Sequence, residues 1–167
     1  MKKLNLLRTW TRVLFILSMI AVIFSPGLFL INMIKPDMVP STFRFNGSGD
    51  FSFIAALIAL LTFAGYCLFV YALHLFRKVL DLFNKRKFFE AEVTVLLSKT
   101  GQFIFYGALL YSIPQNIYYA FTQNAISIDF VAFWIIVFVF STGLFFTVLG
   151  EVFKMAKTIK DENDLTV

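Results

Sequence analysis

The side chains best suited to bind a ligand inside an apolar stretch follow a proline, at Pro114-Gln115-Asn116. Proline has no N–H, so the carbonyl four residues earlier, at Leu110, loses its usual helical donor. The two carboxamides can bind a neighbouring helix, or line a site for an ion or small ligand. Since no charged residue accompanies them, we favour hydrogen bonding around a kink, with the ligand site as the alternative.

The other reactive side chains each stand alone. His74 has no second metal ligand at helical spacing, and Cys67 is the only cysteine. Glu151 lies three residues before Lys154, which predicts a local ion pair. The sequence has no nucleotide-binding glycine pattern, no HExxH and no nucleophile elbow. We therefore expect no catalytic residue, no cofactor and no metal site, and a protein that is not an enzyme.

The elements that carry these residues are apolar and long. Of the 167 residues, 59% are hydrophobic and 15% charged, whereas a soluble domain has about 25% charged residues. This composition predicts an all-α membrane protein with one domain, residues 1–167, whose four transmembrane helices form a bundle. The expected spans are 13–34, 51–76, 101–121 and 130–149. Small residues in the second span, including Gly65, predict close approach of a neighbouring helix.

Positive charge predicts the orientation of these spans. Thirteen of the fifteen Lys and Arg residues lie before the first span, between the second and third, or after the fourth, and two lie in the other loops. The positive-inside rule then places both termini and a hairpin, residues 77–100, in the cytoplasm. Charges at membrane edges suit anionic lipid headgroups, and we expect no direct binding to nucleic acid. With its basic amino end and long first span, the chain is expected in a bacterial cytoplasmic (inner) membrane.

Apolar periodicity predicts that helices continue beyond the spans. A stripe through Phe76 and Phe83 extends the second helix to a turn at residues 84–87. A new helix is expected to begin near Phe88 or Phe89. After the fourth span, a cytoplasmic tail, residues 150–167, reads as a basic amphipathic helix on the membrane surface, ended by an acidic turn.

The tail also carries a family resemblance. Glu151-Val152-Phe153 followed by residues 160–167, KDENDLTV, resembles the terminal signature of a bacterial membrane-protein family catalogued as domain of unknown function 2975. The hairpin is similar at Leu82-Phe83, Phe88, Glu92-Val93, Leu96 and Thr100-Gly101. That family commonly has a glycine in the hairpin turn, where this chain has Lys85-Arg86-Lys87. The resemblance implies a small integral membrane protein, often encoded beside a small helix-turn-helix regulator.

Two functional hypotheses follow. In the first, the protein is a membrane-embedded regulatory partner of a cytoplasmic protein such as that regulator. Its docking residues are expected at the hairpin tip and in the tail: Lys85, Arg86, Lys87, Phe88, Asp161, Glu162, Asn163, Asp164 and Leu165. In the alternative, an oligomeric small transporter, channel or sensor uses the kink at Pro114, Gln115 and Asn116, because one copy of four spans is small for alternating access.

Overall fold

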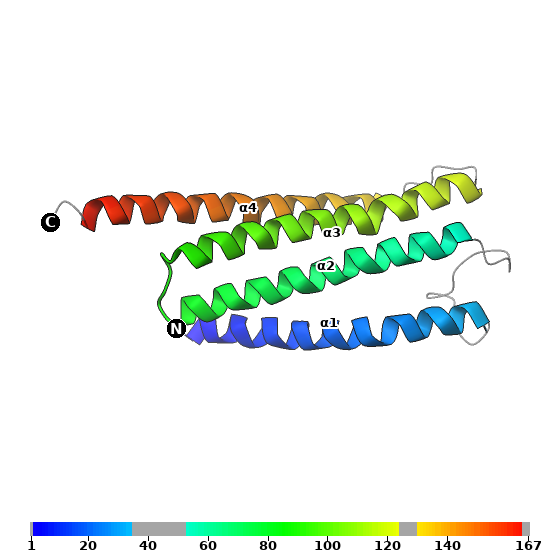
Figure 1. Ribbon diagram of the computed structural model, residues 1–167, viewed down its shortest axis with the longest axis horizontal. Helices are drawn as coiled ribbons and strands as arrows, with labels where there is room; N and C mark the ends of the chain where they lie inside the picture. The colour runs from blue at the N-terminus through cyan, green and yellow to red at the C-terminus, as the bar shows by residue number, and fades with distance from the viewer. Residues whose placement is uncertain (1, 35–52, 124–129, 165–167) are drawn as a thin grey trace.

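A computed structural model describes residues 2–34, 53–123 and 130–164 (Figure 1). Four helices make up nearly all of these residues: α1 (Lys2–Ile34), α2 (Phe53–Asn84), α3 (Ala91–Gln123) and α4 (Phe130–Asp164). They lie antiparallel to their neighbours, so the start of α1, the α2–α3 turn and the end of α4 lie at the same end of the molecule. We call this the turn end.

All four helices are long and apolar enough to cross a membrane, which confirms the all-helical, four-span prediction. Each helix has 32 to 35 residues and is therefore about 50 Å long at 1.5 Å per residue. The hydrocarbon core of a bilayer is only about 30 Å thick. Each helix is thus about 20 Å longer than the hydrocarbon core is thick.

The predicted extensions of the helices are present, with two corrections. Helix α2 runs past Phe76 to Asn84, but α3 begins at Ala91 rather than near Phe88 or Phe89. Phe88 belongs to the turn because its ring packs on Phe83, 5.3 Å between centroids. The acidic run from Asp161 to Asp164 continues α4 as helix and does not end it in a turn.

The helices form a row in which sequence neighbours are spatial neighbours (Figure 1). Helix α3 lies between α2 and α4, whereas α1 packs against α2 alone among the described helices. The bundle is therefore open between α1 and α4.

Glycine brings the backbones of α2, α3 and α4 into contact. A Cβ on Gly65 of α2 would lie 2.9 Å from the carbonyl oxygen of Gly107 in α3. On the other face of α3, a Cβ on Gly101 would lie 2.5 Å from the carbonyl oxygen of Gly143 in α4. Real Cβ atoms essentially never approach other atoms so closely. Such approach favours helix association in lipid, where apolar burial gives little driving force.

The buried core lies toward the turn end of α2, α3 and α4. Its buried members are Leu75, Val79, Val93, Leu96 and Leu97, with Phe146 and Phe153 of α4 packed against them. Elsewhere large apolar side chains point outward: Ile23 of α1 is 70% exposed and Phe138 of α4 is 72% exposed. In a membrane protein, lipid covers such side chains.

We predict that Gly101→Ala destabilises the α3–α4 contact, because the added methyl group overlaps backbone that cannot swing aside. Overpacking of this kind costs about 1–3 kcal/mol, so the apparent melting temperature in detergent should fall by at least about 3 °C. Gly27→Ala is the matched control, since a Cβ there meets nothing within 4 Å. Equal melting temperatures for both variants would contradict the packing argument.

Candidate functional site

The charged side chains described in the structure gather at the turn end (Figure 1). Helix α1 contributes Asn5, Arg8, Thr9 and Arg12, which occupy one face because they are spaced three or four residues apart. The last turns of α2 contribute Asp81 and Asn84 to the facing surface. These groups meet only because α1 packs antiparallel against α2 (Figure 1).

An ion pair fixes α1 on α2. The Nε–H of Arg8 donates to Oδ1 of Asp81 at 2.5 Å, and both side chains are about one-third exposed. One turn before Asp81 in α2, the guanidinium of Arg77 lies 4.6 Å from the ring centroid of Phe15 in α1. This is a cation–π contact. The α1–α2 interface therefore relies on charge near the turn end, unlike the glycine contacts of the other helices.

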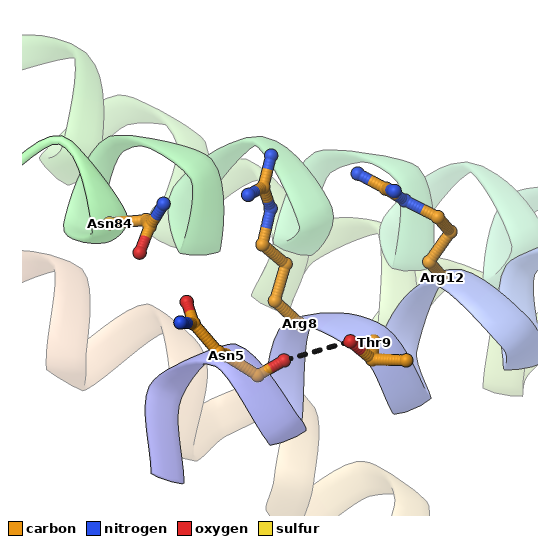
Figure 2. A pocket seen from close by; sticks show the side chains of 5 residues that line it. All are labelled: Asn5, Arg8, Thr9, Arg12 and Asn84. Atoms are coloured by element: carbon orange, nitrogen blue, oxygen red, sulfur yellow. Dashed lines mark hydrogen bonds between the residues drawn. The ribbon is translucent and has the colours of Figure 1, made fainter. Parts of the chain in front are cut away.

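A polar pocket of about 260 Å³ lies beside this ion pair, lined by Asn5, Arg8, Thr9, Arg12 and Asn84. Figure 2 shows the side chains of Arg8 and Arg12 reaching from α1 toward α2, while the carboxamides of Asn5 and Asn84 face each other between the helices. The Thr9 hydroxyl donates to the Asn5 carbonyl at 3.0 Å. This arrangement presents amide and guanidinium N–H groups to an acceptor, which suits an anion.

The sequence alone does not predict this pocket. Its pattern indicates Arg8 and Arg12 only as charges that set orientation, and Asn84 only as a turn residue. The available signal was the spacing of Asn5, Arg8, Thr9 and Arg12, which puts four polar side chains on one face of an otherwise apolar helix.

The hairpin tip, predicted as a docking element, is a tight turn that exposes its basic side chains. The N–H of Arg86 donates to the Phe83 carbonyl at 3.0 Å, and the N–H of Lys87 donates to the Leu82 carbonyl at 3.1 Å. This pair of bonds is the Schellman motif that closes many helices. Arg86 has φ 60°, the left-handed conformation that glycine adopts most easily. Lys85, Arg86, Lys87 and Phe88 are all exposed.

Lys87 also bridges the turn to the start of α3. Its Nζ lies 2.7 Å from Oε1 of Glu90, and this hydrogen bond raises the pKa of the Lys87 ammonium group above its usual value. Lys87 therefore keeps its positive charge at neutral pH. The tip presents three adjacent cations, of which Lys87 is paired with Glu90.

The tail residues predicted to dock lie at the same end. Asp161, Glu162 and Asn163 are exposed on the last turn of α4, whereas the side chain of Asp164 and all of Leu165 lie outside the described residues. Nζ of Lys160 lies 5.7 Å from the ring centroid of Phe89, which brings α4 against the hairpin tip. The predicted ion pair is also present, with Nζ of Lys154 3.7 Å from Oε2 of Glu151.

The kink residues lie within α3, which does not end at Pro114. The helix runs through Pro114, which is buried, to Gln123. Nδ2 of Asn116 donates to the Ser112 carbonyl at 2.8 Å, and the Ser112 hydroxyl donates to the Ala108 carbonyl at 2.6 Å. These bonds join side chains of α3 to carbonyl oxygens of the same helix. The ligand site stays a prediction. The side chain of Gln115 is among those that the structure does not describe.

His74 packs among aromatic rings. Its imidazole lies 5.5 Å from the ring of Phe15 and 6.3 Å from that of Tyr71, measured between centroids. In residues 2–34, 53–123 and 130–164, no three His, Cys, Asp or Glu side chains are grouped closely enough to hold a metal ion.

Comparison with known proteins gives one match. A family model described as a protein of unknown function, DUF2975, matches residues 11–167. No curated protein and no solved structure matches the chain.

We predict that Arg86→Gly stabilises the protein, because glycine adopts φ 60° without the cost of about 1–2 kcal/mol that a side chain incurs. The apparent melting temperature in detergent should rise by about 2–4 °C. Arg86→Ala is the control, since it removes the same charge and keeps the strain. An equal rise in the alanine variant would instead assign the effect to repulsion among the three cations.

Proposed function

The chain belongs to the DUF2975 family, and we propose that it is a multi-pass protein of the bacterial cytoplasmic membrane that docks a cytoplasmic regulatory protein at its turn end. The four apolar helices indicate the membrane. The class of partner, a small helix-turn-helix regulator, is the one that the family resemblance implies.

The orientation is part of this proposal. The segments near the turn end carry thirteen of the fifteen Lys and Arg residues. Because cytoplasmic loops are enriched in Lys and Arg, the turn end faces the cytoplasm and both termini are cytoplasmic. A soluble regulator then reaches the hairpin tip and the end of α4 directly.

The observation that carries the proposal is an apolar stripe on α4 that is longer than a membrane is thick. Exposed apolar side chains recur along one face over about 39 Å of helix: Phe133, Val137, Leu144, Val148, Val152, Met155 and Ile159. Helix α4 begins at Phe130, and about twenty residues of helix cross the hydrocarbon. A helix that enters hydrocarbon at Phe130 therefore leaves it near Leu149.

Met155 and Ile159 then lie on the cytoplasmic side, 62% and 66% exposed. Apolar surface exposed to water costs about 25 cal/mol per Å², which a partner's apolar face would recover. Charged groups border the stripe, including the exposed Glu151 and Glu162. An apolar centre with a charged rim is the arrangement that binds an amphipathic helix of a partner.

The test places a photocrosslinking amino acid at Met155. Val148, about two turns deeper on the same stripe, is the matched control. Irradiation of native membranes should give a discrete adduct with a soluble protein from Met155 and only lipid adducts from Val148. Mass spectrometry identifies the captured protein, and a chain ending at Lys160 tests whether the acidic tail contributes to its capture.

Two outcomes contradict the proposal. Lipid adducts at both positions mean that α4 tilts, so that lipid covers the whole stripe. An adduct at Met155 with the mass of two copies of this chain means that the stripe joins subunits.

A further inference from the structure

The pocket between α1 and α2 has an excess of positive charge. Helix α1 contains no acidic residue, and Asp81 is the only one in α2. The same two helices hold six Lys and Arg residues, all toward the turn end. Asp81 neutralises Arg8, whereas no charged partner faces Arg12 among the described residues. The lining therefore keeps a net positive charge.

Hydrogen-bond donors remain available in the pocket. A guanidinium group has five N–H donors, and the bond to Asp81 uses only the Nε–H of Arg8. The terminal N–H₂ groups of Arg8, the guanidinium of Arg12 and the carboxamides of Asn5 and Asn84 line the same space (Figure 2). Its volume of about 260 Å³ compares with about 30 Å³ for a water molecule in the liquid. A tetrahedral phosphate group with its ester substituents fits such a volume.

The pocket lies at the depth of lipid headgroups. Trp10, 60% exposed, is at the same level of α1, and tryptophan is enriched where membrane meets water. Exposed apolar residues continue from Val13 and Leu14 inward. Arg8 precedes Val13 by five residues, or about 7.5 Å of helix, and the headgroup region of each leaflet is about 5–8 Å thick. Arg8 and Arg12 thus lie level with the phosphates.

We propose that this pocket is a binding site for a phosphate group, carried either by an anionic phospholipid or by free phosphate. The two guanidinium groups contact the phosphate oxygens, and the asparagine carboxamides donate to the remaining ester or hydroxyl oxygens. This site is independent of the docking stripe on α4, which lies at the other edge of the row (Figure 1).

The test measures retention of phosphatidylglycerol by native mass spectrometry, using full-length protein released from nanodiscs that mix it with phosphatidylcholine. Arg12→Gln is the main variant, because no residue in the described ranges forms an ion pair with Arg12 whose loss would disturb the fold. We expect retention at least about tenfold weaker, the effect of losing a hydrogen bond between charged groups. Lys85→Gln, an equal loss of charge at the turn end outside the pocket, should change retention less than twofold.

Asn84→Ala supplies a variant with unchanged charge. Loss of its carboxamide should weaken retention about threefold, as expected for one hydrogen bond. Each variant is first checked for a single monodisperse species in detergent.

A second arm separates the two sources of phosphate. The melting temperature is measured for protein in pure phosphatidylcholine nanodiscs. The buffer contains either sodium phosphate, on the order of 10 mM, or sodium chloride of equal ionic strength. A stabilisation by phosphate that disappears in Arg12→Gln supports a site for free phosphate; retention of phosphatidylglycerol without it supports a lipid site. Equal losses in Arg12→Gln and Lys85→Gln, with none in Asn84→Ala, overturn the proposal, because diffuse charge then explains the binding.

Discussion

Backbone contact at glycine is the constraint on which this structure depends. Helix α3 offers Gly107 to α2 and Gly101 to α4, so the three helices pack as a unit with α3 in the middle. Lipid tails are as apolar as leucine, so apolar side chains alone give these helices little reason to associate. Helix α1 joins the unit differently, through the ion pair of Arg8 with Asp81. The molecule is thus a tightly packed unit of three helices with a fourth attached by charge.

Much of the fold was predictable from local pattern, because hydropathy and helical periodicity are properties of neighbouring residues. The stripe through Phe83 correctly extended α2, whereas the start of α3 was predicted too early because Phe88 packs back on Phe83. The pocket was not predictable in this way. Arg8 and Asp81 are separated by 73 residues, and only the packing of α1 on α2 brings them together. The sequence also left open which group the Asn116 carboxamide binds, and in the structure its Nδ2 donates to the Ser112 carbonyl.

The two outer helices of the row carry the two proposed sites. Helix α4 presents an apolar stripe that continues beyond the hydrocarbon, and α1 completes a basic pocket at the headgroup level. The inner helices, α2 and α3, have partners on both sides and supply the buried core. This arrangement separates the residues that hold the protein together from those of the two proposed sites. Substitutions at the two edges can therefore change binding without disturbing the glycine contacts.

The attachment of α1 to a single neighbour has a consequence for biosynthesis. The ribosome makes α1 before α2, so α1 enters the bilayer before the helix that it packs against exists. Until Asp81 has been translated, it cannot pair with Arg8, and both Arg8 and Arg12 are in contact with lipid and water. The first acceptor that these arginines meet in the membrane is a lipid phosphate. When α2 arrives, it closes the pocket around whatever the arginines already hold, so a lipid can be built into the protein during insertion rather than recruited afterwards.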